Sequence, residues 1–333
     1  MRSVAIPLVA LVVGCAHREL RREPSVTSSP DVCRTSLPFC LPALDMELLL
    51  REAPLDIRAA EPIGAGLTGA RRLLVDLPSG TVVRLKWKTS ALGGDGHNRS
   101  PRRELAAYAL QRPLLSEADY VVPPTVARCL PERTFRRQID AEGAPPTFDG
   151  DDCVLGILAY WIEDATQLVG YSQARFAADP TYRRRIALLN VITHLMDHRD
   201  TKPENFLVLR GSDPRAFSID NGLAFSGWRT PRGWFWHEWQ DLLVDSLPSD
   251  LVARLRSVGR AELTETLGTV AQFRVRAGRL EPMPLEPPFD ANEGVRRRDD
   301  AIQLGLTSTE IDGVAARLST LLDRVDSGAV KVF

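Results

Sequence analysis

The sequence lacks a large net charge of either sign. Its 42 lysines and arginines nearly balance 43 aspartates and glutamates, which leaves a formal net charge of −1. This balance gives no electrostatic case for nucleic acid as the main partner. Two basic clusters, Arg183–Arg185 and Arg296–Arg298, are interpreted as solvated faces of helices or loops. The 333 residues, 44% of them hydrophobic, are enough to bury a sizeable core in one large domain or two lobes.

Long apolar runs are scarce as well. The run from Val4 to Val13 is too short to cross a bilayer as a stable helix, but its length suits the core of a signal peptide. It follows Arg2 and ends in VVGC, which resembles the lipobox of bacterial lipoproteins. The resemblance implies that residues 1–15 are a lipoprotein signal peptide and that Cys15 is lipidated. An ordinary cleaved signal peptide is the alternative.

The residue after the predicted lipidation site is Ala16, not the Asp that would indicate retention in the inner membrane. By the same resemblance we expect an outer-membrane lipoprotein of the cell envelope, facing the periplasm or the cell surface. Its contact with the membrane would be made through the lipid anchor.

Cysteine is rare, and neither a CxxC pair nor a zinc-ligand spacing occurs. With Cys15 set aside, four cysteines remain. An even number in an oxidising compartment favours two disulfides, for which three pairings exist. We predict the pairs Cys33–Cys40, which closes a short loop, and Cys129–Cys153, which closes a longer one. Free buried thiols are the alternative.

The order of sequence patterns predicts an α+β protein with two lobes. Residues 16–50 are interpreted as a tether, because their first thirty or so residues are rich in Pro, Ser, Thr and Arg without periodicity. Residues 51–163 are predicted to form a β-rich N-lobe that binds nucleotide. Residues 164–333 are predicted to form a helical, catalytic C-lobe, since amphipathic spacing recurs at 181–196, 248–267 and 308–326.

The N-lobe contains a predicted hairpin. Residues 70–77 and 81–88 are β-rich and are separated by Pro78-Ser79-Gly80. A helix is predicted to begin at Ser100-Pro101, with Ser at the cap and Pro at the first helical position.

Three glycines, Gly64, Gly66 and Gly69, precede the hairpin. They do not open a helix, which argues against a dinucleotide-binding Rossmann motif. A glycine loop between strands can lay backbone N–H groups over phosphates, because no Cβ blocks close approach. Taken alone the motif is weak, and a plain turn is the alternative.

Lys86 lies on the second strand of the hairpin, 22 residues after Gly64. A lysine there would point under the glycine loop and reach phosphate oxygens. Lys88 shares its face, because side chains alternate along a strand, and is the alternative. An inward-pointing lysine needs a counter-charge, which Glu104 in the following helix can supply.

The strongest signal is the stretch DHRDTKPENFLVLRGSDPRAFSIDNGLAF, residues 197–225. Asp200 and Asn205 are five residues apart, with Lys202 between them, and Asp220 follows a short strand-like run. Phosphoryl transfer needs a carboxylate to accept the nucleophile's proton, oxygen ligands for Mg²⁺ and a cation near the phosphate. These side chains match the three needs. Helix caps and turns alone are the alternative.

HRDTKPENFLV resembles the HRDxKxxN catalytic loop of protein kinases, and IDNGLAF resembles their DFG segment. The resemblance implies ATP with Mg²⁺ or Mn²⁺ as cofactors. It also implies Asp200 as the catalytic base, Lys202 as a phosphate contact, and Asn205 and Asp220 as metal ligands. The nucleotide site would comprise Gly64, Gly66, Gly69 and an ion pair between Lys86 and Glu104.

The chain departs from cytoplasmic kinases at Asn221, which replaces the Phe of DFG, and no APE motif follows. Asp-Asn-Gly is similar to the secretory-pathway kinases, the Golgi casein kinase and xylosyl kinase group. RLKWK, RRELAAYAL and VVPPTVAR occur in the order expected for that group. The NF pair after the loop is similar to HipA-like kinases.

In the secretory group the base lies in an MDRH motif, which would correspond to Met196-Asp197 here. Asp197 is therefore the alternative base. We favour Asp200 as the base, because Asp200 stands five residues before Asn205 and Asp197 does not.

These patterns predict an exported, lipid-anchored kinase that transfers the γ-phosphoryl group of ATP to a protein Ser/Thr or glycan hydroxyl. One alternative is a catalytically silent kinase-fold scaffold of the cell envelope, and another is a nucleotidyl transferase of the same fold. The aromatic stretch Trp228–Trp239 is interpreted as packed core rather than as an acceptor groove.

Overall fold

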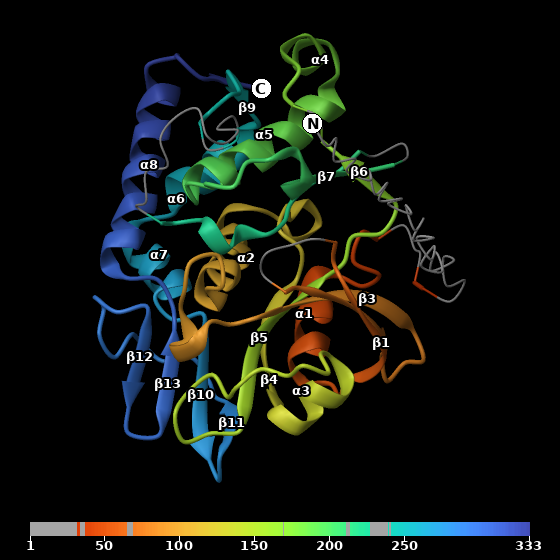
Figure 1. Ribbon diagram of the computed structural model, residues 1–333. Coiled ribbons are helices and arrows are strands. Elements are labelled where there is room, and N and C mark those ends of the chain that lie inside the picture. Colours follow the sequence, from red (N-terminus) through yellow and green to blue (C-terminus); the bar gives the residue numbers. More distant parts are fainter. Residues whose placement is uncertain are drawn as a thin grey trace, which may run out of the picture.

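The computed structural model describes residues 32–33, 37–64, 69–168, 170–210, 214–226, 239 and 241–333. Within them the chain has the predicted α+β fold of two lobes, a β-rich N-lobe and a C-lobe dominated by helices (Figure 1). The N-lobe is built on an antiparallel sheet of order β1-β2-β3-β5-β4. Its strands are β1 (Asp56–Pro62), β2 (Arg71–Asp76), β3 (Val82–Thr89), β4 (Thr125–Pro131) and β5 (Cys153–Tyr160).

The predicted hairpin is confirmed as β2 and β3. Its turn is closed by the Leu77 N–H, which donates to the Thr81 carbonyl at 2.8 Å. Alternation along the two strands places Leu73, Val75 and Leu85 in the core, where each is fully buried. The glycine stretch lies between β1 and β2, where a loop between strands was expected.

The helix expected after Ser100 is α2 (Pro101–Leu114), which lies in the middle of the molecule between the two lobes (Figure 1). It is buried along most of its length, including Leu105–Leu110. Near its end, the Gln111 side chain accepts from the backbone N–H groups of Val121 and Val122 and donates to the Val122 carbonyl. These bonds fix the segment that enters β4.

The predicted tether is wrong in its last part, because Ala43–Glu52 forms a helix, α1, that belongs to the N-lobe. Met46 and Leu50 on its inner face are fully buried. Arg128 of β4 donates to the Leu50 and Ala53 carbonyls at 3.2 and 3.0 Å, which satisfies the end of the helix. The rest of the tether before residue 37, apart from residues 32–33, and the signal peptide with Cys15 lie outside the described residues.

Both predicted disulfides, Cys33–Cys40 and Cys129–Cys153, are present. The second joins the neighbouring strands β4 and β5, in which Cys153 stands opposite Pro131. The first lies next to Val32, which forms a bridge with Val82 at the start of β3.

The helices predicted for the C-lobe are also present. The C-lobe has α4 (Gln173–Ala178), α5 (Pro180–Leu195), α6 (Ser249–Ser257), α7 (Arg260–Leu267) and α8 (Ser308–Asp326), while α3 (Glu132–Gln138) covers the N-lobe. Helix α5 is the buried centre of the C-lobe, and α8 runs along its side (Figure 1). In the part of the chain that the structure describes, no helix is long and apolar enough to span a bilayer.

The C-lobe assignment of residues 164–333 is wrong for residues 271–304, which form an antiparallel sheet of order β11-β10-β13-β12. Its strands are β10 (Ala271–Arg276), β11 (Arg279–Pro282), β12 (Val295–Arg298) and β13 (Ala301–Leu304). Phe273 and Ile302 of this sheet pack in one apolar cluster with Leu155 and Ile157 of β5. The second sheet therefore packs against the N-lobe rather than within the helical lobe.

Three short strands form a small sheet in the C-lobe. They are β6 (Ala165–Gln167), β7 (Phe206–Leu209) and β8 (Ala216–Ser218), paired in that order. The end of the chain returns to this lobe, where β14 (Lys331–Val332) pairs in parallel with β9 (Ser246–Leu247).

Candidate active site

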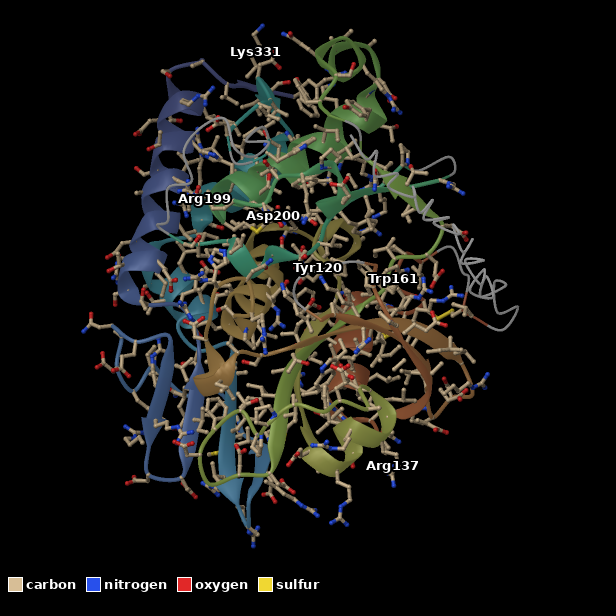
Figure 2. The ribbon with its side chains drawn as sticks, in the orientation of Figure 1. Tyr120, Arg137, Trp161, Arg199, Asp200 and Lys331 are labelled. Atoms are coloured by element: carbon tan, nitrogen blue, oxygen red, sulfur yellow. A yellow bond between two sulfur atoms is a disulfide. The ribbon has the colours of Figure 1, made fainter. Side chains whose placement is uncertain are left out.

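The predicted catalytic loop connects α5 to β7 and lies between the two lobes, where Figure 2 labels Asp200. Asp200 is largely buried, and its Oδ2 lies 3.2 Å from Nζ of Lys202. The Asn205 side chain donates to the Asp200 carbonyl at 2.8 Å, which closes the loop on itself. The three predicted side chains are thus held on one short segment with their polar atoms toward one another.

His198 contacts the backbone of the same loop. It is fully buried, and its Nδ1 accepts from the Asp200 N–H at 3.2 Å. Burial lowers the pKa of His198, so the ring stays neutral and keeps Nδ1 available as an acceptor. Its ring packs against Phe206 at the start of β7.

Asp220 lies directly after β8, in a left-handed backbone conformation with φ of 58°. The neighbouring Ile219 N–H donates to the Asn205 carbonyl at 2.9 Å. This bond joins the segment that carries Asp220 to the catalytic loop. The backbone of Asn205 therefore lies next to Ile219, the residue before Asp220.

Glu104 connects α2 to this segment through both of its carboxylate oxygens. Oε2 accepts from the Asn221 N–H at 2.9 Å, and Oε1 lies 2.9 Å from Nζ of Lys88. The ion pair predicted between Lys86 and Glu104 is therefore wrong in its lysine. The strand lysine that reaches Glu104 is Lys88, which the sequence offered only as the alternative.

Lys88 also lies 2.6 Å from Oδ1 of Asp220, and Lys86 approaches the same oxygen at 3.2 Å. Burial disfavours the charged form of Lys88, but Glu104 and Asp220 outweigh it and raise its pKa. Burial likewise disfavours charge on Asp220, but Lys86 and Lys88 outweigh it and lower its pKa. The aspartate is therefore held ionised, as a metal ligand must be.

Gly222 lies where Lys88 and the segment after Asp220 meet. A Cβ on Gly222 would stand 2.9 Å from Nζ of Lys88 and 2.8 Å from Oδ1 of Asn98. A side chain at this position would therefore push the lysine or the loop aside. The absence of a Cβ lets the two lobes approach closely here.

Lys86 lies at the side of a cavity between the lobes. Tyr160, the last residue of β5, and the following Trp161 and Ile162 line the cavity together with Lys86 and Asp220. Figure 2 shows Trp161 on the N-lobe side of the same seam that holds Asp200. The cavity is thus lined by both apolar and charged side chains.

The glycine loop is described only at its two ends. Gly64 and Gly69 both have positive φ, of 53° and 64°, which favours glycine, and no atom lies within 4 Å of a Cβ built on either. Gly66 lies outside the described residues. The ends of the loop lie next to the strand pair β2 and β3 that carries Lys86.

Asp197, the alternative base, is engaged elsewhere. Its Oδ2 accepts from Nε of Arg199 at 3.0 Å and also from Nη2 of the same guanidinium. It has a left-handed φ of 50°. Each carboxylate thus has a cationic neighbour, Arg199 for Asp197 and Lys202 for Asp200.

The donor set fits a magnesium or manganese ion. In the described residues no cluster of three or more His, Cys, Asp or Glu side chains is able to hold a metal. Magnesium bound with a nucleotide does not need one, since one or two protein oxygens join phosphate oxygens and water. Asn205 and Asp220 supply that number of oxygen ligands.

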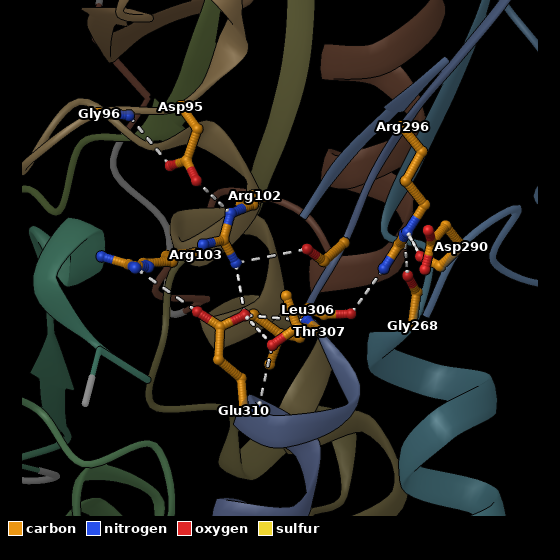
Figure 3. A network of polar contacts seen from close by, with 11 residues as sticks. Asp95, Gly96, Arg102, Arg103, Gly268, Asp290, Arg296, Leu306, Thr307 and Glu310 are labelled. Carbon is orange, nitrogen blue, oxygen red and sulfur yellow. Dashed lines mark hydrogen bonds and ion pairs between the residues drawn. The ribbon is translucent and has the colours of Figure 1, made fainter. Parts of the chain in front are cut away.

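A polar network fastens α2 to the C-lobe and the second sheet (Figure 3). Arg102 contacts Asp95 on one side, and its Nη1 donates to Oε2 of Glu310 at 2.6 Å on the other. Glu310 in turn completes a capping box with Thr307 at the start of α8. The helix that carries Glu104 is therefore held at its first turn.

The aromatic stretch is described only at Trp239, which is buried and packs against Phe206 with ring centroids 5.2 Å apart. The core interpretation holds for this residue. Residues 227–238 lie outside the described residues.

No protein-family model and no curated protein matches the chain. Solved structures do. The chain is similar to the Golgi casein kinase, with 13% identity and a TM-score of 0.53 over 89% of this chain and 79% of that one. A hydra Fam20 structure with sugar gives 13% identity and 0.51 over 87% of this chain and 92% of that one. The Golgi casein kinase with Mn and ADP bound gives 12% and 0.50 over 89% and 78%. The fold is therefore kinase-like and close to that of the secretory-pathway kinases.

Proposed function

We propose that this protein is a phosphotransferase that moves the γ-phosphoryl group of ATP to a hydroxyl group of a protein or glycan. The observation that carries the proposal is the contact of Lys88 with both Glu104 and Asp220 at the point where the catalytic loop also arrives. Folding brings together β3, α2 and the segment after β8 to form it. A kinase requires the ion pair of a strand lysine with a helix glutamate, and a metal-binding aspartate beside it, before transfer.

Asp200 is assigned as the catalytic base. It accepts the proton of the acceptor hydroxyl while the oxygen attacks the γ-phosphorus, and the bond to the β-phosphate oxygen breaks to release ADP. Lys202, 3.2 Å from the Asp200 carboxylate, neutralises charge on the phosphoryl group. Asn205 and Asp220 would hold Mg²⁺ or Mn²⁺, which supplies charge neutralisation for the phosphates when bound.

The compartment is part of the proposal. Two disulfides are typical of an oxidising environment, which supports export. We propose that Cys15 carries the lipid and anchors the protein in the outer membrane. A Cys15→Ser variant should then leave the envelope fraction and appear in the soluble fraction, and an unchanged distribution would contradict lipidation.

The full chain incubated with envelope material and γ-labelled ATP tests the function. We expect label on protein or glycan, lost in the Asp220→Ala variant. Label from α-labelled ATP would show nucleotidyl transfer instead. Absence of label from both nucleotides, together with absence of metal-dependent nucleotide binding, would show a silent scaffold.

A further inference from the structure

Lys86 and Lys88 lie on the same face of β3, because side chains two residues apart share a face of a strand. Trp87 between them is fully buried on the opposite face. In the register with β5, Lys86 stands opposite Ala159 and Lys88 opposite Ile157. Lys86 is therefore the lysine nearer to the segment after β5 that lines the cavity.

Lys88 has no donor left for a further partner. An ammonium group has three N–H donors, and three acceptors surround Nζ. These are Oε1 of Glu104 at 2.9 Å, Oδ1 of Asp220 at 2.6 Å and Oδ1 of Asn98 at 3.0 Å. The side chain is only 2% exposed, and Gly222 closes it in from the C-lobe side.

Lys86 has one ion pair, the 3.2 Å contact with Asp220, and within the described residues no other polar partner. Its side chain is 15% exposed and lines the cavity beside Trp161. Two of its three N–H donors therefore remain for a ligand in this cavity.

Resting on the proposed function, we propose that the two lysines divide the work of a single kinase lysine. Lys86 binds the phosphate oxygens of the nucleotide. Lys88 is a positioning residue that, with Asn98 as its third partner, holds Glu104 and Asp220 in place.

The environment of the two side chains favours this division. If Lys88 turned to a phosphate, Glu104 would keep a buried charge without its cation, and Asn98 would lose its donor. If Lys86 turned, Asp220 would lose only the longer of its two ion pairs. Lys86 is therefore free to move to the ligand at the smaller cost.

Lysine acylation tests which of the two lysines the nucleotide covers. The chain has only four lysines, so each can be followed: Lys86, Lys88, Lys202 and Lys331. The full chain would be treated with an N-hydroxysuccinimide ester, with and without ADP and Mn²⁺, and mapped by fragmentation mass spectrometry. We expect Lys86 to be acylated and then protected by nucleotide, and Lys88 to remain unmodified in both samples. Lys331 is exposed on β14 and serves as the internal control. Nucleotide-dependent protection of Lys88 but not of Lys86 would overturn the assignment.

The role of Asn98 is tested without nucleotide. In Asn98→Ala, Lys88 loses one of its three acceptors, so we expect the thermal midpoint of the free protein to fall. An unchanged thermal midpoint in this variant would contradict a positioning role for Asn98. This result does not depend on whether the protein is a kinase.

Affinity measurements complete the test. By calorimetry with ADP and Mn²⁺, we expect Lys86→Met to raise Kd on the order of 10- to 100-fold at an unchanged thermal midpoint, with partial rescue in Lys86→Arg. Lys88→Met should lower the thermal midpoint, and Asn98→Ala should lower kcat more than it raises KM for ATP. An unchanged Kd in Lys86→Met would defeat the inference alone, whereas no binding by the wild-type protein would defeat the proposed function as well.

Discussion

Arg102 of α2 donates to Glu310 at the start of α8, with 2.6 Å between Nη1 and Oε2. Only one residue separates Arg102 from Glu104, whose carboxylate reaches Lys88 and Asn221. A contact in the first turn of α8 thus holds the first turn of the helix that carries Glu104. This contact joins segments that lie 208 residues apart in the sequence.

Glu310→Gln should destabilise the protein by about 3 kcal/mol, because it leaves Arg102 and Arg103 without the charge they share in a largely buried site. Urea unfolding measures the change. Asp312→Asn on the same helix is the matched control, since its pair with Arg260 is exposed on both sides. Loss of that exposed pair should cost about 0.5 kcal/mol or less. Equal losses in the two variants would contradict the anchoring role.

Gly222→Ala should impair the site more than the fold. The new Cβ would stand 2.9 Å from Nζ of Lys88, so the ammonium or Asn98 must shift. We expect turnover to fall by about 10-fold or more, as small displacements of catalytic groups do. Gly259→Ala is the control, because no atom lies within 4 Å of its Cβ position. A Gly222→Ala enzyme with wild-type kcat would refute the close approach.

Local patterns in the sequence sufficed for much of the site. The spacing of Asp200, Lys202 and Asn205 predicted the loop that lies between the lobes, because all three are on one short segment. Period-two alternation identified the face of β3. It was unable to distinguish Lys86 from Lys88, since both lie on that face and the choice depends on where α2 crosses the strand. That crossing is set by long-range contacts such as Arg102 with Glu310.

Two structural elements were not predicted from the sequence, because their local patterns are weak. Helix α1 has only ten residues and follows a Pro- and Ser-rich stretch, so its buried positions Met46 and Leu50 gave a weak signal. The second sheet was missed because its strands are short and rich in arginine. The partnership of Asn98 with Lys88 had no signal beyond a polar loop composition. Its φ of 50° arises from the fold around it.

Stability should fall in acid partly through Asp119, which connects the segment after α2 to α5. Burial disfavours its charge, but Arg184, Ser116 and Arg185 outweigh it and lower the pKa of Asp119. A lowered pKa stabilises the fold above the unfolded value near 4, and the contribution is lost as pH falls through the folded pKa.

Asp119→Asn should therefore cost about 1–2 kcal/mol at pH 7 and progressively less below pH 4. Unfolding by urea at a series of pH values measures both. Asp326→Asn, which removes an exposed pair with Arg256, should leave the pH profile unchanged. A constant difference between wild type and Asp119→Asn across this range would exclude the linkage.

The catalytic base is decided by comparing Asp200→Asn with Asp197→Asn. In Asp200→Asn the loop keeps its bond from Asn205, because that bond uses the Asp200 carbonyl. We expect turnover to fall on the order of 10²- to 10⁴-fold with nucleotide affinity largely kept, as for loss of a general base. In Asp197→Asn the ion pair with Arg199 is lost, so stability should fall while turnover of the folded enzyme changes by only a few fold. The opposite ranking of turnover would assign the base to Asp197, and the thermal midpoints of both variants separate this outcome from simple unfolding.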